Sequence, residues 1–327
     1  MRTPHHRSVR LSAALVALTL LAAACGGDDA TTAGSGNGTD GDLSGTVNID
    51  GSSTVAPLTE VAAELFMEQN SGVRVTVAVS GTSGGFQKFC NGETDGNDAS
   101  RAIKESEIEL CEQNGIAYDN VQVANDALSI VVNLENPLDC LTVDQASQIW
   151  DEGSSVSTWG DIDGLDLDST AERQSITLYG PGTDSGTFDF FTEAINGEEG
   201  KIRNDYTDIG EDDFAAVTAV QGDPWAMGYI PYSFVQEAGD AVKPLQIDDG
   251  DGCVDATLDN VQSGDYSPLG RPLFLYASDT ALARAEVQAF FDFYIENQEE
   301  IADLAGFVPM NDDQVSDAEA KVAALTG

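Results

Sequence analysis

Residues 47–85 read VNIDGSSTVAPLTEVAAELFMEQNSGVRVTVAVSGTSGG, and this stretch decides the fold. Its first four residues predict a short strand, and the apolar residues between 58 and 66 recur at the spacing of one helical face. From 73 to 79, valine alternates with other residues at the period of two that a strand requires. The stretch is therefore strand, helix, strand, and each strand ends in a loop of glycine and hydroxyl residues.

Strands and helices keep alternating along the rest of the chain. Further strands are predicted at 121–133, 175–179 and 272–276, and further helices through 90, at 143–150, from 185, at 213–221 and around 287–295. Between 223 and 270, glycines, prolines and acids leave no clear period. Such alternation predicts an α/β protein with a largely parallel sheet. The folded body, about 280 residues long, favours two lobes over one core.

The N-terminus has the layout of an export signal. Residues 1–24 hold three arginines and no acid, and end in an apolar run that is too short to span a membrane. Three alanines then precede Cys25, which is typical of a lipobox and predicts a lipid on that cysteine; ordinary cleavage with a free thiol is the alternative. Residues 25–44 would form the lipid anchor and a flexible tether. We expect the chain outside the cytoplasm, anchored to the cytoplasmic membrane.

Four further cysteines predict two disulfides, because an even number of cysteines in an exported chain is typical of paired thiols. Three pairings are open. We favour Cys90 with Cys111, because that loop is local, and Cys140 with Cys253, because both flank one central lobe. Zinc binding is the rival interpretation, but the wide spacings contain no CxxC pair.

The charge of the chain excludes some partners. The sequence carries 57 Asp plus Glu against 14 Lys plus Arg, a formal charge of −43, which becomes −46 once the three arginines of the signal are removed. Such a surface repels nucleic acid, so no nucleic-acid partner is expected. It also repels small anions, and an anion site here must therefore rely on local donors aimed at the ligand.

Three segments combine glycine with hydroxyl residues directly before a predicted helix: GSSTV at 51–55, SGTSGG at 80–85 and GPGTDSGT at 180–187. The start of a helix leaves backbone N–H groups unpaired and carries partial positive charge, and Ser and Thr hydroxyls add further donors. Three such starts that converge would enclose a tetrahedral oxyanion. The alternative is that each hydroxyl is only an N-cap, although capping does not require the adjacent glycines.

An enzyme is the alternative from another class. Residues 81–85 also match G-x-S-x-G, which would make Ser83 the nucleophile of a hydrolase. A serine nucleophile needs a base, and the two histidines of the sequence, His5 and His6, belong to the predicted signal. A Ser-Lys pair with Lys88 or Lys104 lacks a convincing motif. The acidic runs at 161–168 and 248–251 lack the spacing of calcium loops, so we predict no enzyme, no metal and no cofactor.

Arg101 is a candidate ligand, because cationic side chains are scarce in this chain. Guanidinium is planar, permanently charged and suited to contact two phosphate oxygens at once. The alternative is a surface ion pair with Asp98.

Four motifs in this order resemble the phosphate-binding proteins of Pst-type ABC importers: IDGSSTV at 49–55, VSGTSGGF at 79–86, DASR at 98–101 and GPGTDSGTF at 180–188. The resemblance extends from about 45 to 297. It implies a type II periplasmic-binding-protein fold, in which two lobes joined by crossover strands close on phosphate in the cleft between them. It also implies a monomer whose partner is the importer's permease.

Carried over position by position, the resemblance implies these phosphate-binding residues: Ser53, Thr54, the backbone of Val55, Thr82, Ser83, Arg101, Ser185, Gly186 and Thr187. Two positions depart from better-known members, which have aspartate where Arg101 stands and arginine where Pro181 stands. The acceptor for the phosphate proton is therefore open, with Asp98 and Asp184 as candidates. Because such an acceptor would repel sulfate, it would favour phosphate. Another oxyanion, such as sulfate, molybdate or arsenate, remains the alternative ligand.

The predicted lobe boundaries follow from this fold. Lobe one would combine residues 45–127 with 262–327, and lobe two would take 128–261.

Overall fold

The computed structural model describes residues 43–183, 185–210 and 212–326. The predicted signal at 1–24, Cys25 and nearly all of the tether lie outside these residues, as does Asp184.

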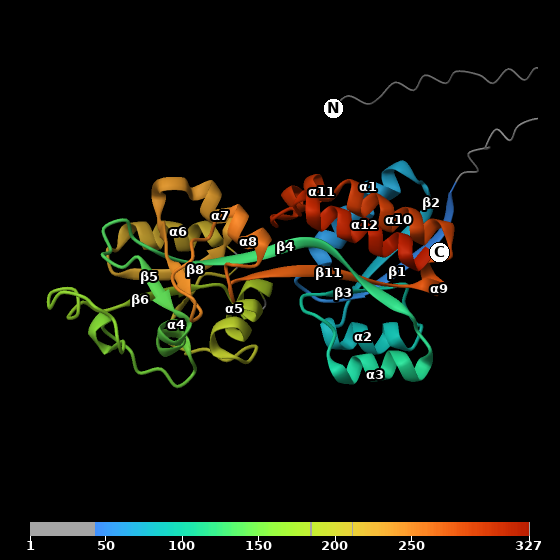
Figure 1. Cartoon of the computed structure of the whole chain (residues 1–327). Coiled ribbons are helices and arrows are strands. Elements are labelled where there is room, and N and C mark those ends of the chain that lie inside the picture. The colour runs from blue at the N-terminus through green and yellow to red at the C-terminus, as the bar shows by residue number, and fades with distance from the viewer. Residues whose placement is uncertain (1–42, 184, 211, 327) are drawn as a thin grey trace, which may run out of the picture. The chain divides into compact units, whose positions relative to one another are not determined.

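The N-terminal third follows the predicted alternation and ends in one long strand (Figure 1). Its elements are β1 (Ser44–Gly51), α1 (Ala56–Gln69), β2 (Gly72–Val79), α2 (Thr82–Cys90), β3 (Gly96–Ala99), α3 (Glu105–Asn114) and β4 (Tyr118–Val132). Leu58, Ala62 and Phe66 of α1 are buried as the helical spacing predicts.

The middle of the chain contains shorter elements. They are β5 (Cys140–Thr142), α4 (Val143–Trp150), a 3-10 turn (Trp159–Asp161), β6 (Thr177–Gly180), α5 (Gly186–Asn196), β7 (Thr207–Asp208), α6 (Asp213–Gly222), β8 (Ala226–Pro231), α7 (Tyr232–Ala238), a second 3-10 turn (Gly239–Ala241), β9 (Lys243–Pro244), β10 (Gln246–Asp248) and α8 (Leu258–Ser263). The stretch from 223 to 270, which shows no period in the sequence, thus contains five short helices and strands of regular structure besides a 3-10 turn.

The C-terminal segment begins with the second long strand, β11 (Gly270–Ser278), and continues as α9 (Asp279–Leu282), α10 (Ala285–Glu296), α11 (Gln298–Ala305) and α12 (Asp312–Thr326). Val287, Phe290 and Phe291 on α10 are buried, as the helical spacing predicts. Within the described residues, no helix combines the length and the apolar character needed to cross a membrane.

One sheet has the strand order β2-β1-β3-β11-β4-β8-β6-β7, with β9 also paired to β4. The pairs β1-β2, β1-β3, β6-β7 and β6-β8 are parallel, as predicted. The pairs that involve β4 or β11 within this sheet are antiparallel. The sheet is therefore mixed, and the predicted largely parallel sheet is wrong, because β4 and β11 run antiparallel to their neighbours through its middle.

The two long strands connect two separate cores (Figure 1). Residues 118–127 of β4 pair with β11, and residues 128–132 pair with β8. One core packs α1 and α10 on β1 and β2, with Phe66 edge-on to Phe290. The other core is built around Trp150, Phe191 and Tyr229. The rings of Phe191 and Tyr229 stack with their centroids 3.7 Å apart. The two-lobe fold expected from the sequence is thus confirmed, while its residue boundaries stay a prediction.

Both predicted disulfides are confirmed. Cys90 bonds Cys111 and ties α2 to α3, and Cys140 bonds Cys253 across a sequence separation of 113 residues. Since the second bond closes a long loop, it restricts the unfolded chain more than the first.

A glycine controls how closely α2 approaches the end of β1. A Cβ on Gly85 would lie 2.6 Å from the Cα of Gly51 and would overlap the side chain of Asn97. Only glycine therefore fits at this point of the second loop.

We expect Gly85→Ala to lower the free energy of unfolding by about 1–3 kcal/mol, because the backbone of β1 must shift to admit the methyl group. Urea denaturation followed by circular dichroism measures this. The control is Gly222→Ala at the end of α6, where a Cβ meets nothing within 4 Å, and stability should be unchanged or higher by up to about 1 kcal/mol. Equal stability of the two variants would contradict the close approach.

Candidate functional site

The three glycine and hydroxyl loops each lead into a helix, as predicted. Val55 precedes α1, Gly81 precedes α2 with a left-handed φ of 77°, and Ser185 precedes α5. Ser185 is an N-cap, since its hydroxyl accepts a hydrogen bond from the Thr187 N–H at 3.3 Å. In the described structure neither α1 nor α2 has such a side-chain cap. The capping alternative thus describes the third loop. In the first loop the Ser52 hydroxyl accepts from the Thr54 N–H at 3.2 Å, just before α1 but not as its N-cap.

The donors at these two helix starts differ. At α1, the Ala56 N–H already donates to the Ser52 carbonyl at 3.0 Å, and Pro57 has no N–H. At α2, neither proline nor a side-chain cap occupies the first turn. Because the first N–H groups of a helix have no intrahelical acceptor, α2 offers the larger set of free donors.

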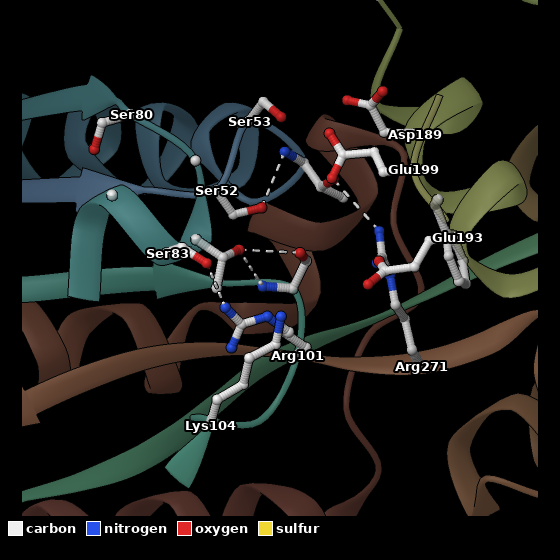
Figure 2. Close-up of a pocket in the computed structure, with 16 residues that line it drawn as sticks. Ser52, Ser53, Ser80, Ser83, Arg101, Lys104, Asp189, Glu193, Glu199 and Arg271 are labelled. Atoms are coloured by element: carbon white, nitrogen blue, oxygen red, sulfur yellow. Dashed lines mark hydrogen bonds and ion pairs between the residues drawn. The ribbon is translucent and has the colours of Figure 1, made fainter. Parts of the chain in front are cut away.

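The first two loops line one cavity of about 220 Å³ (Figure 2). Five of the predicted ligands lie on its wall: Ser53, Thr54, Thr82, Ser83 and Arg101. The volume is several times the roughly 30 Å³ that one water occupies in the liquid, so a small anion fits. Val55 is fully buried and lines neither this cavity nor the next, which leaves only its backbone to act.

The third loop lies against the first loop but lines a neighbouring cavity. Ser185, Gly186 and Thr187 border a space of about 280 Å³ that shares Ser53 and Thr54 with the first cavity. A Cβ on Gly186 would be 3.4 Å from the Thr54 Oγ1, so α5 begins in close approach to the first loop. Thr54 of the first loop thus borders both cavities, one shared with the second loop and one shared with the third. No single cavity in the described structure is lined by all three loops.

Arg101 holds two partners at the cavity. Its guanidinium donates to both carboxylate oxygens of Glu107, at 2.8 and 2.9 Å, and to the Ser83 Oγ at 2.8 Å. Burial acts to raise the pKa of Glu107, but hydrogen bonds from Arg101 and the Lys104 backbone hold it below its ordinary value. The ion pair with Asp98 considered as an alternative is wrong, because Glu107 is the partner of Arg101.

Asp98 lies behind the first loop. Its carboxylate is completely buried and accepts a hydrogen bond from the Thr59 hydroxyl at 2.8 Å, while its backbone carbonyl accepts from the Ser52 N–H at 2.9 Å. Burial raises the pKa of Asp98 to about 8, with further effects from Asp50 and Glu60. Asp98 lines neither cavity, so the structure does not bring this candidate acceptor together with the loop hydroxyls.

The cavity also contains charged residues that the sequence did not identify as ligands. Arg271 of β11 lies on the wall beside Thr54, and Lys104 lies on it beside Arg101. Three acids also line the cavity: Asp189 and Glu193 of α5, and Glu199 just after that helix (Figure 2). Burial raises the pKa of Asp189 to about 6, and the charge of Glu199 adds to this. The scarcity of cations drew attention to Arg101 and could have drawn it to Arg271.

No metal site is visible in the part of the chain that the structure describes, where no three His, Cys, Asp or Glu side chains are grouped to hold an ion.

The fold and the cavity together define a two-lobe binding protein with hydrogen-bond donors for a small ligand. A model described as a PBP superfamily domain matches residues 31–298. The chain is 40% identical to protein SphX of Synechococcus elongatus over 81% of this chain and 77% of that one. It is 33% identical to the phosphate-binding protein PstS of Staphylococcus saprophyticus over 95% and 93% of the two chains.

Two solved structures are similar to this chain in both fold and sequence. One is a possible phosphate binding protein from Planctomyces limnophilus, with a TM-score of 0.81, 37% identity and coverage of 87% of this chain and 100% of that one. The other is an ABC-type phosphate transport receptor from Vibrio cholerae, with a TM-score of 0.65, 25% identity and coverage of 81% and 99%. The chain belongs to the PBP superfamily and, within it, to the family of the PstS-type phosphate-binding proteins.

The buried proton of Asp98 makes stability depend on pH. Because its pKa is near 8 in the folded state and near 3.8 when exposed, the folded chain keeps a proton that the unfolded chain releases between these values. This part of the stability is therefore lost as pH rises from about 4 to 8, by roughly 1 kcal/mol per pH unit.

We expect Asp98→Asn to remove that dependence. From pH 5 to pH 7.5 the native chain should lose unfolding free energy that the variant keeps, so the variant becomes more stable relative to the native chain. Urea denaturation at several pH values measures it. Asp303→Asn, which removes an exposed carboxylate of α11, serves as the control and should keep the native slope. A native slope in the Asp98→Asn variant would show that Asp98 ionises normally in the folded chain.

Proposed function

We propose that this chain binds inorganic phosphate outside the cytoplasmic membrane and delivers it to the permease of an ABC importer. The observation that carries the proposal is the cavity where the starts of α1 and α2, both without a side-chain cap, meet the guanidinium of Arg101. The names of the relatives agree with this ligand: PstS of Staphylococcus saprophyticus is a phosphate-binding protein, and the Vibrio cholerae structure is a phosphate transport receptor.

The proposed ligands are donors of three kinds. Backbone N–H groups come from Val55 and from the helix starts, hydroxyls come from the loops, and Arg101 adds a cation. The full proposed set is Ser53, Thr54, Val55, Thr82, Ser83, Arg101, Ser185, Gly186 and Thr187. Ser185 to Thr187 would join the others when the second lobe, proposed as 128–261, closes on the first, proposed as 45–127 with 262–327.

The acceptor of the phosphate proton is proposed from chemistry. At neutral pH, Asp98 keeps its own proton because its pKa is raised to about 8, which makes it a poor acceptor. Of the two predicted candidates, Asp184 is therefore the one that we retain. A carboxylate there would accept the proton of hydrogen phosphate and repel sulfate, which has none to give.

The hydrolase alternative is disfavoured at Ser83. Its Oγ accepts a hydrogen bond from Arg101, and the nearby Glu107 carboxylate accepts hydrogen bonds from both terminal nitrogens of that guanidinium. A carboxylate whose pKa is below its ordinary value is a weak base. A role in binding without turnover is thus the better account of Ser83.

Export and anchoring complete the proposal. We infer from the sequence that residues 1–24 are removed as a signal and that a lipid on Cys25 anchors a monomeric chain to the cytoplasmic membrane. Mass spectrometry of the chain isolated from membranes would detect the diacylated cysteine.

Calorimetric titration of the purified chain, stripped of bound anion, tests the proposed ligand. We expect one phosphate per chain at neutral pH and no heat with sulfate. Binding of sulfate, molybdate or arsenate without phosphate would replace the ligand by another oxyanion, and silence toward all four would sink the proposal.

Ser83→Ala separates receptor from hydrolase. In a receptor the variant should bind phosphate about 5- to 100-fold more weakly, because one hydrogen bond to the anion is lost. If the native chain hydrolyses esters, the Ser83→Ala variant should have no ester turnover. Turnover that disappears with Ser83 while phosphate affinity stays constant would favour the enzyme.

A further inference from the structure

Arg271 lies where the two lobes and the two long strands meet. Its guanidinium packs over the ring of Phe190, which precedes Glu193 on α5, with 3.6 Å between Cζ and the ring centroid. Its Nη2 lies 3.4 Å from the Thr54 Oγ1 on the first loop. The side chain is only 13% exposed, and it lines the same cavity as Arg101. Arg271 therefore contacts elements of both lobes.

The hydrogen bonds of Arg271 use one side of its guanidinium. Its Nε and Nη2 both donate to the Asp126 Oδ2, each at 3.2 Å. Asp126 lies directly opposite Arg271 in the register of β4 and β11. Its Nη1 makes no hydrogen bond in the described residues; its ion-pair partner is the Glu193 carboxylate at 3.9 Å, and the charge of Asp189 on the same helix also acts on Arg271. Arginine has five N–H donors, so the two on Nη1 remain to be satisfied.

Arg101 shows the opposite pattern. Both of its terminal nitrogens donate, to Glu107, to the Ala102 carbonyl and to Ser83. Because its donors are already used inside lobe one, an anion would have to replace existing partners to gain a two-oxygen contact. At Arg271 an anion can bind without breaking the pair with Asp126.

Glu193 is the carboxylate that faces the free nitrogen. Its side chain is 48% exposed, so it is bound less firmly than Asp126, whose side chain is 9% exposed. A half-exposed ion pair at 3.9 Å contributes little, and a phosphate that offers two oxygens at shorter distance would displace it.

We propose that Arg271 is a direct anion ligand through Nη1, and that Glu193 competes with the anion for this nitrogen. This inference rests on the proposed function. It assigns a second cationic ligand, besides Arg101, to a crossover strand, at a position outside the three loops. Asp126 then acts as a positioning residue that fixes the plane of the guanidinium.

Titration calorimetry with phosphate on four chains tests the inference: native, Arg271→Gln, Glu193→Gln and the double variant. We expect Arg271→Gln to weaken binding about 10- to 100-fold, because a hydrogen bond to a charged ligand is lost. Glu193→Gln should tighten binding about 2- to 5-fold, because a competing carboxylate is removed. In the double variant, the gain from Glu193→Gln should disappear.

The control is Arg284→Gln, which removes an arginine that pairs with Asp95 and Glu286 outside both cavities. Its affinity should stay within about 2-fold of native, since surface ion pairs contribute little. Thermal unfolding of each chain without anion separates a role in folding from a role in binding.

Three results would overturn the inference. They are unchanged affinity in a folded Arg271→Gln chain, no tightening by Glu193→Gln, and equal tightening with or without Arg271. The Glu193→Gln arm decides if Arg271→Gln does not fold. A native chain silent to phosphate contradicts the proposed function instead; the same four chains are then titrated with sulfate, molybdate and arsenate, and silence toward all of them overturns both.

Discussion

Electrostatic repulsion is the constraint on which the rest of the structure depends, because a chain with a formal charge of −43 has to hold an anion. At long range the field of such a protein opposes the ligand, and only donors within a few ångström can reverse that. The chain supplies them where parallel strands end and helices begin, at the starts of α1, α2 and α5. Two acids, Glu107 and Asp126, pair with the cavity arginines Arg101 and Arg271 and keep these cations fixed in place.

The two long strands serve both architecture and chemistry. β4 and β11 pair antiparallel through the middle of the sheet and connect the two cores. Their register places Asp126 opposite Arg271, so one ion pair lies where the lobes meet, with Arg271 on the wall of the first cavity and Asp126 on the wall of the second. A charge pair this deeply buried stabilises the fold only when its hydrogen bonds are satisfied. The strand register that pairs Asp126 with Arg271 therefore also sets the orientation in which the guanidinium meets a ligand.

The sequence predicts the local parts of this account well and the long-range parts poorly. The period of two and the helical spacing from 47 to 85 locate β1, α1 and β2, and the glycine and hydroxyl runs locate three helix starts. The pair of Arg271 with Asp126 joins residues 145 positions apart, so no local pattern contains it. The sequence offered Asp98 as an alternative partner of Arg101 and as a candidate proton acceptor, but all four residues of β3 are buried, and the Asp98 carboxylate turns to Thr59. The third loop lines a different cavity from the second loop, because its position depends on how the lobes pack, which periodicity does not encode.

A crystal structure of the chain grown with phosphate is the most direct test of the central claim, that donors at helix starts and a guanidinium hold the anion in the cavity beside Thr54. The account predicts one phosphate between the first two loops, with oxygens about 2.7–3.1 Å from backbone N–H groups of α2, loop hydroxyls and an arginine. A phosphate bound elsewhere, or in this cavity without contact to the start of α2, would contradict it.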